Sequence, residues 1–379
     1  MGDRPAPLVL VAAPGEPSAV FGSYAAVAEA GQALLAAELT SRLGALGMAV
    51  RPLPPGAARP FHWGSWYADA ARVAVAKARR EGRPLDAIGY AGAGALALAS
   101  DALLDELGSP LAGEVVANNR YSADAFVVAG DAERLDAALD ALQACDTDNA
   151  AVRCLEDAGF AWRDLGALPW SRFDVDTPLD LALLRLATRL PGARPLDNAL
   201  AGFLEMATLP GGRQLQVPNL EAVGTVIRSR EAELVVAGRI PSAAWSYLET
   251  ETACRVRGYV EERGMRAARD SRPRSLLADW LDRLGPADLV GELASLADAV
   301  ILDSRVLMAA VAGSSDAAAW PPEDERFASD FGDASAIGTR WLSELTAAAA
   351  AASVPVLLGG HALVSDGLRI VVEASWLGR

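Results

Sequence analysis

Residues 171–181 read SRFDVDTPLDL, and this stretch decides how the first half of the chain is interpreted. Asp174 and Asp176, one residue apart, precede a Thr-Pro pair. Proline is favoured at the first position of a helix, so a helix is predicted to begin at Pro178 and to run to residue 190. The residues before it predict the end of a strand, in which alternate side chains share one face. The two carboxylates should therefore lie together, either capping the helix or holding a metal ion.

The sequence upstream of this junction alternates between apolar strand-like runs and amphipathic helix-like segments. Gly and Pro residues occur at most of the boundaries between these segments. A polar island at 118–121 separates two further strands, or the two arms of a hairpin. This alternation indicates an α/β fold, with a mostly parallel sheet covered by helices on both faces. Strands are predicted at 7–13, 48–54 and 85–92, and helices at 26–46, 66–82 and 131–145.

The second half of the chain differs from the first in its sequence pattern. Residues 192–218 are rich in Gly and Pro and are typical of a domain junction. We therefore expect an α/β domain over residues 1–195 and a second domain over 205–379. The second domain is predicted to be mostly helical with a few strands, among them closing strands at 354–360 and 368–376.

The segment FDVDTPLDLALL (173–184) resembles the late strand–helix junction of nucleotidyltransferases with a glycosyltransferase-A-like fold. That group includes molybdenum-cofactor guanylyltransferases, sugar-phosphate cytidylyltransferases and phospholactate guanylyltransferases. Residues 85–107 resemble their central strand, loop and following helix, and the resemblance covers about residues 7–190. It implies a glycosyltransferase-A-like sheet and a catalytic role for Asp174 and Asp176. It also implies that Asp176 would hold Mg²⁺.

Two positions depart from the family pattern. The loop after the first strand carries Gly15, Glu16 and Gly22 but no Arg or Lys, whereas the family has a basic residue there. Residues 91–95 contain no acid where the family has a metal-binding Asp. The expected function is therefore a nucleotidyltransferase-like protein with altered or lost catalysis. Its expected ligand is a nucleotide or a phosphorylated small molecule, with Mg²⁺ as cofactor if it is active.

The polar island between the two central strands has two interpretations. Asn pairs tolerate tight turns, so a hairpin turn explains Asn118 and Asn119 without any ligand. Arg120 and Tyr121 beside that pair also suit a phosphorylated or sugar-like ligand, with Arg120 contacting a phosphate. The residue types leave both interpretations open.

The second domain has its own candidate residues. Asp303 and Arg305 interrupt an apolar run, and charges that become buried there need partners. Gly359 and Gly360 precede His361 in a loop that can bind an anion or position a general base, although a structural histidine is equally consistent. These residues support an alternative function, in which a non-catalytic module uses the second domain to bind an anionic ligand or a second copy of the chain.

The composition of the chain limits the binding partners and the cellular location to be expected. The net charge of −15 argues against a broad nucleic-acid-binding or membrane-binding surface. The three cysteines form no metal-binding spacing, and their odd number predicts reduced thiols in the cytoplasm.

Overall fold

The computed structural model describes residues 5–13, 22–53, 55–56, 61–166, 170–261 and 272–377. Gly15 and Glu16, in the loop where the sequence departs from the family pattern, lie outside these described residues. The chain divides into two compact units, Met1–Ser18 with Glu29–Asp176, and Ala19–Ala28 with Thr177–Arg379. The division after Asp176 comes ahead of the junction near 195–205 that the sequence suggested.

A six-stranded mixed sheet forms the centre of the first unit. Its strand order is β2-β1-β3-β5-β4-β6, and β5 alone among them runs antiparallel to its neighbours. The predicted α/β fold with a mostly parallel sheet is therefore confirmed for this unit, and 114–129 forms the hairpin. The strands are β1 Leu8–Ala12, β2 Ala49–Leu53, β3 Ala87–Ala91, β4 Glu114–Ala117, β5 Ala125–Ala129 and β6 Ala161–Asp164.

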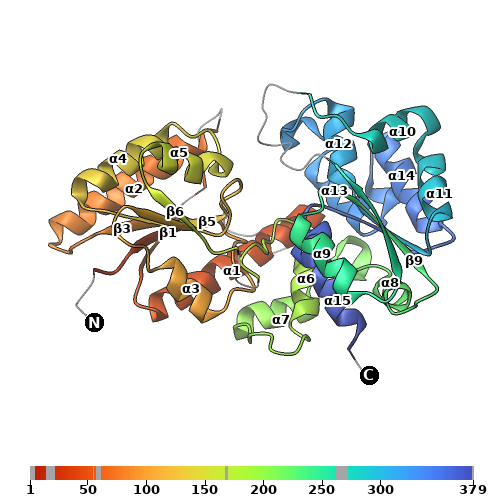
Figure 1. The fold of residues 1–379 in the computed structure, drawn as a ribbon, viewed down its shortest axis with the longest axis horizontal. Helices are drawn as coiled ribbons and strands as arrows, with labels where there is room; N and C mark the ends of the chain where they lie inside the picture. Colours follow the sequence, from red (N-terminus) through yellow and green to blue (C-terminus); the bar gives the residue numbers. More distant parts are fainter. Residues whose placement is uncertain are drawn as a thin grey trace. The chain divides into compact units, whose positions relative to one another are not determined.

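Helices cover both faces of this sheet (Figure 1). One buried apolar cluster joins α2, α4 and α5 to one face, and a second joins α1 and α3 to the other. Three layers result, because the inner strands β1, β3 and β5 are buried on both sides and therefore need apolar partners above and below. The helices are α1 Tyr24–Ala45, α2 Trp63–Arg80, α3 Asp101–Leu107, α4 Ala132–Gln143 and α5 Ala151–Asp157.

A fully parallel four-stranded sheet, in the order β10-β9-β11-β12, forms the centre of the second unit. Helices α6, α8, α9 and α15 contact one another as one group, and α10, α11, α12 and α14 as another. Figure 1 shows these groups on opposite sides of β9. The strands are β9 Glu233–Gly238, β10 Arg255–Val260, β11 Ala299–Asp303 and β12 Val356–Gly359.

The helices of the second unit are mostly short, and a small two-stranded sheet of β7 and β8 accompanies them. Across the described ranges of the chain, no helix has the length and apolar character needed to cross a bilayer. The bounds are α6 Pro178–Ala187, α7 Asn198–Met206, β7 Thr208–Leu209, β8 Arg213–Gln214, α8 Leu220–Ile227, α9 Ser242–Glu251, α10 Leu276–Leu284, α11 Pro286–Ser295, α12 Ser304–Ala312, α13 Glu323–Asp330, α14 Arg340–Ala351 and α15 Asp366–Ser375.

Two predicted strands are wrong. Residues 368–375 of this segment lie in α15, whose apolar side chains are buried against α6 and α8, so a run that reads as a strand is a helix packed on one side. Residues 173–176 belong to no strand, although their burial alternates as a strand's would, with Phe173 and Val175 buried. Strands β9, β10 and β11 were not predicted, because short buried apolar runs look alike in strands and helices.

The predicted start of α6 at Pro178 is confirmed. The Thr177 side chain accepts a hydrogen bond from the Asp180 N–H at 3.2 Å, and the Asp180 carboxylate accepts one from the Thr177 N–H at 2.9 Å. This reciprocal capping box satisfies two N–H groups that the helix itself leaves unbonded. Both side chains are buried, so water cannot replace either bond.

Replacing Thr177 by Ala should lower the free energy of unfolding by about 1–2 kcal/mol, because the Asp180 N–H loses its acceptor. Chemical denaturation of the two proteins measures the difference. Thr250→Ala, on the exposed side of α9, is the matched control and should change stability by less than about 0.5 kcal/mol. Equal effects of both substitutions would show that the capping box contributes nothing particular.

Candidate functional site

The segment carrying Asp174 and Asp176 is bound to the loop after β3. The Val175 N–H donates to the Gly94 carbonyl at 3.2 Å, and the Val175 carbonyl accepts from Gln32 Nε2 at 2.9 Å. A Cβ on Gly94 would lie 2.1 Å from that carbonyl oxygen, so only glycine permits this approach. The two aspartates are thereby held beside the carboxyl end of β3.

The turn of the β4–β5 hairpin brings further polar groups to the same edge of the sheet. Asn118 is 1% exposed; it donates to Asp124 Oδ2 at 3.1 Å and accepts from the Ala125 N–H at 3.1 Å. The Asp124 carbonyl accepts from the Gly92 N–H at 2.8 Å, which ties the turn to the loop after β3. Asn118 thus serves the hairpin turn and also orients a carboxylate at the strand ends.

The carboxyl group of Asp124, at this edge of the sheet, has a strongly raised pKa. Loss of solvent, followed by the charge of Asp148 and more weakly that of Asp176, raises the pKa of Asp124 from 3.8 to about 7, against the opposing hydrogen bond from Asn118. A carboxyl group that titrates near neutral pH can donate or accept a proton under ordinary conditions. The Tyr90 hydroxyl lies nearby, and burial, with the charges of Asp148, Asp124 and Asp174, raises its pKa well above the usual range.

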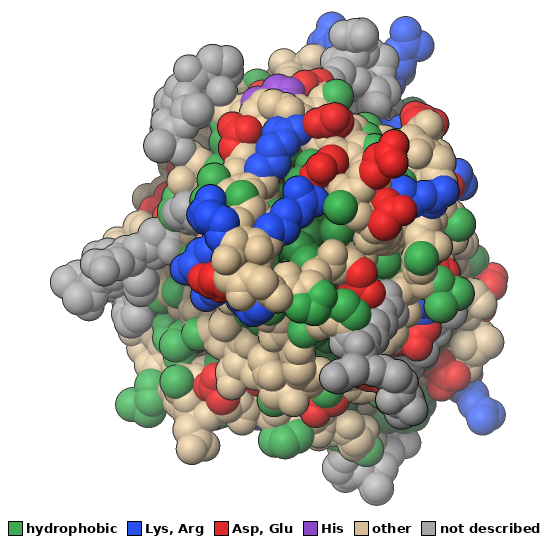
Figure 2. All heavy atoms as spheres, turned by 90° about the vertical axis from the view of Figure 1, so that its left-hand side faces the viewer, with side chains coloured by type: hydrophobic (Ala, Val, Ile, Leu, Met, Phe, Trp, Pro, Cys, Tyr) green, Lys and Arg blue, Asp and Glu red, His purple; other side chains and the backbone are tan. Residues whose placement is uncertain are grey.

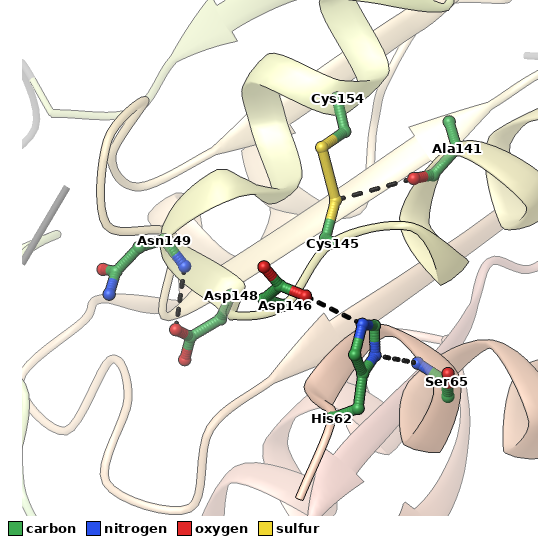
Figure 3. The surroundings of a disulfide bond; sticks show 8 residues. All are labelled: His62, Ser65, Ala141, Cys145, Asp146, Asp148, Asn149 and Cys154. Carbon is green, nitrogen blue, oxygen red and sulfur yellow. Dashed lines mark hydrogen bonds and ion pairs between the residues drawn. A yellow bond between two sulfur atoms is a disulfide. The ribbon is translucent and has the colours of Figure 1, made fainter. Parts of the chain in front are cut away.

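Asp148 was not predicted as a site residue. It lies in a turn between α4 and α5 that a disulfide, Cys145–Cys154, closes (Figure 3). In the same turn Asp146 contacts His62 Nε2 at 2.9 Å, and His62 Nδ1 accepts from the Ser65 N–H at 3.1 Å. His62 therefore caps α2 and connects that helix to the turn.

The disulfide corrects the expectation of reduced thiols. Cys145 directly follows α4 and Cys154 lies in α5, and the two helices pack together, so the pair forms through tertiary contact. Nothing in the spacing of the two residues signals this. Cys254 is buried and unpaired, and burial raises the pKa of its thiol.

The remaining residues of the polar island point to structural roles. Arg120 donates to both oxygens of Glu156, at 2.7 and 2.9 Å, and lies over the rings of Tyr121 and Trp162. Asn119 accepts from the Tyr121 N–H at 3.0 Å, a local turn bond. Arg120 is thus already engaged by a carboxylate at the position where a phosphate was expected.

Arg172, inside the stretch that opened the sequence analysis, is the basic residue that contacts this edge. Its Nε donates to the Asn118 carbonyl at 3.2 Å, and its Nη2 contacts Asp164 at 3.3 Å. Nothing in the sequence distinguishes Arg172 from other arginines, since its contact at the sheet edge, the Asn118 carbonyl, is 54 residues away along the chain.

Metal-binding geometry is not preformed. No group of three or more His, Cys, Asp or Glu side chains within the described residues is placed to hold a metal ion.

The surface drawn in Figure 2 shows basic side chains beside acidic ones. The same mixture occurs between α2 and α4, where Arg72 pairs with Asp140 and Arg79 with Asp136.

The second unit gathers its candidate residues at the carboxyl ends of its strands. Asp303 ends β11 and pairs in register with Gly359 at the end of β12, so Gly360 and His361 follow beside Arg305. A Cβ on Gly360 would lie 3.8 Å from Arg305 Nε. The two segments therefore lie side by side, and both Asp303 and Arg305 are buried, as the apolar run around them suggested.

Each of these buried charges has a partner. Arg305 donates twice to Asp330, both at 2.6 Å; burial alone would lower its pKa, but Asp330 raises it above the ordinary value. Asp303 accepts from Arg239, at 2.6 and 3.0 Å. Arg239 was not predicted, because its partner lies two strands further along the chain.

A cavity of about 180 Å³ in the second unit is lined in part by Asp330, the partner of Arg305, together with Asn219, Phe331 and Leu358. Arg257 lies within β10 and contacts Glu233 at 3.5 Å. Neither the cavity nor Arg257 adds a further candidate to Asp303, Arg305, Gly360 and His361 at the strand ends.

Comparison with known proteins adds no relative. No protein-family model matches the chain, and no curated protein sequence matches it.

The pH dependence of stability tests the state of Asp124. The folded protein should hold the Asp124 proton more tightly than the unfolded chain, since the pKa rises from 3.8 to about 7 on folding. Its contribution to the free energy of unfolding is therefore complete below about pH 4 and is lost as the pH rises to about 7. Asp124→Asn, which cannot ionise, should gain stability relative to wild type over that interval.

Urea denaturation at several pH values, from about 4 to about 8, measures this difference in stability. Asp140→Asn, at an exposed ion pair on α4, is the control and should show a constant offset from wild type. If the Asp124→Asn and wild-type curves run parallel, Asp124 has no unusual proton affinity.

Proposed function

We propose that the first unit binds a nucleotide or a phosphorylated small molecule at the carboxyl edge of its six-stranded sheet, as a nucleotidyltransferase-like protein. The observation that carries the proposal is the close contact of Val175 with Gly94. This contact holds Asp174 and Asp176 beside Asp124 at one sheet edge.

The order of strands supports this position. From β1 the chain goes to β2 on one side and then to β3 on the other, so the topology switches between β1 and β3. Ligands of open α/β sheets bind outside the carboxyl ends of the strands at such a switch. Gly92 and Gly94 follow β3 at that point. The helix that begins at Pro178 after the aspartates also agrees with the glycosyltransferase-A-like arrangement that the sequence resembles.

Mg²⁺ would have to arrive with the phosphates of the ligand. The ion keeps several waters and is commonly held by one or two carboxylates together with substrate phosphates. Asp176, which is exposed, and the half-buried Asp174 are the carboxylates that fit this role. The unbound edge is strongly acidic, so a phosphate without its metal ion would be repelled. Binding should therefore require both components, whether or not nucleotidyl transfer follows.

Thermal unfolding with each of the four ribonucleoside triphosphates tests this proposal, with and without MgCl2. One nucleotide should raise the melting temperature by about 3 °C when it is present at about ten times its dissociation constant, and only with Mg²⁺. Asp176→Asn should abolish the rise and Asp174→Asn should reduce it. Both side chains reach solvent, so neither substitution should unfold the protein.

Asp140→Asn serves as the control, since it removes one carboxylate from an exposed position on α4. The same rise in both variants and the control would place the nucleotide elsewhere. No rise with any nucleotide, or with common phosphosugars, would remove the proposal. Release of pyrophosphate in the same mixtures separates binding from retained catalysis.

A further inference from the structure

Two arginines lie over the ring of Tyr121, in the turn of the β4–β5 hairpin. The ring centroid is 5.6 Å from the guanidinium carbon of Arg120 and 5.8 Å from that of Arg153. The two arginines differ in their other partners. Arg120 donates to both oxygens of Glu156, whereas Arg153 makes no ion pair and no hydrogen bond with any described residue. The face of the Tyr121 ring is therefore the contact that the described residues offer to the charge of Arg153.

Arg153 is not a freely solvated side chain. It is half-buried, and its Nε is enclosed with no hydrogen-bond acceptor among the described residues. A positive charge that loses water needs a partner, and a ring face replaces only part of the lost interaction. The chain has 49 acidic residues against 34 basic ones, so a shortage of carboxylates does not explain why Arg153 lacks one. Its donors thus remain for an acceptor that the described chain does not supply.

Arg153 flanks the edge of the sheet that carries Asp124. Tyr121, over which it lies, belongs to the same turn as Asn118 and Asp124. Helix α5 begins directly after the short 3₁₀ helix Asp148–Ala150, and Arg153 lies in its first turn. Because α5 leads into β6, which runs parallel to β4, the start of α5 lies toward the carboxyl ends of these strands. Arg153 is therefore at the same end of the sheet as the carboxylates of the proposed ligand site.

This end of the sheet otherwise repels anions. It carries several carboxylates, and the loop after β1, residues 13–23, contains no Arg or Lys. An arginine that no protein carboxylate neutralises lowers this repulsion for an incoming anion. The guanidinium group presents its N–H donors in a planar fork that matches the oxygens of a phosphoryl group. A phosphorylated ligand can therefore use the aspartates through its metal ion and Arg153 through its own oxygens.

We propose that Arg153 binds a phosphoryl group of the ligand at this edge, in the role that the sequence suggested for Arg120. The proposal rests on the proposed function of the first unit. It goes further by naming the residue that neutralises the phosphate.

Inorganic pyrophosphate, titrated with MgCl2 into the full chain at constant ionic strength, tests the proposal by isothermal titration calorimetry. The wild-type protein should bind it in a saturable way, and Arg153→Gln should bind it at least about tenfold more weakly. Arg153→Lys keeps the charge but not the planar fork, so its affinity should lie between the two. Neither substitution leaves a carboxylate unpaired, so circular dichroism should show both variants folded.

Arg134→Gln is the matched control. Arg134 also lies over an aromatic ring, that of Phe160 at 5.9 Å. It lies beside Gly113 and Gly130, which precede β4 and follow β5, and is therefore at the opposite end of the strands. Its substitution should leave pyrophosphate affinity unchanged.

The outcomes separate this proposal from the proposed function. No saturable binding of pyrophosphate to the wild-type protein, or equal affinities of Arg153→Gln and Arg134→Gln, would overturn the role of Arg153. A rise in melting temperature with a nucleotide that survives in Arg153→Gln would also overturn it, while leaving the proposed function intact. Pyrophosphate binding that depends on Arg153, without a rise for any nucleotide or phosphosugar, would support Arg153 and reject those ligands.

Discussion

The contact between the backbones of Gly94 and Val175 fixes the position of the two aspartates at the sheet edge of the first unit. It joins the loop after a central strand to a segment from the far end of the same unit, with no room for a side chain between them. Without this contact, Asp174 and Asp176 would be two solvated carboxylates on a connecting segment of the chain. With it, they share an edge with Asn118 and Asp124, and their charges contribute to the unusual proton affinity found there.

The second unit uses a similar device with different chemistry. A glycine that tolerates a positive φ brings the end of β9 against Asp303, and the following arginine closes the gap with two hydrogen bonds. In both units glycine allows two strand ends to approach, and charged side chains then fill the edge of the sheet. The first edge carries several carboxylates close together, whereas the charges at the second are paired, Arg239 with Asp303 and Arg305 with Asp330.

Local signals explain what could be predicted from the sequence. Asp131 and Thr177 each cap a helix that begins where the sequence predicted, because capping involves residues only three positions apart. The alternation of strands and helices gave the α/β class. The order of the strands could not be read in this way, and neither could β9, β10 and β11, whose apolar runs carry no period of their own. For the same reason Asp148, Arg172 and Arg239 escaped notice: each acquires its role from a partner distant in sequence. The error at 368–376 has the opposite origin, since β-branched residues packed on one side of α15 imitate a strand.

The register of the sheets has a consequence for how the chain reaches this structure. Val9 pairs with Gly89, and Leu234 with Ala299, so in each sheet a long segment of chain must loop back before these parallel strands can pair. The β4–β5 hairpin is different, since Val116 pairs with Val127 across a short turn. Ordering that turn costs little conformational entropy compared with the crossovers around it. The segment that carries Asn118 and Asp124 is therefore one that the chain can assemble locally, ahead of the long-range contacts that later surround it with charge.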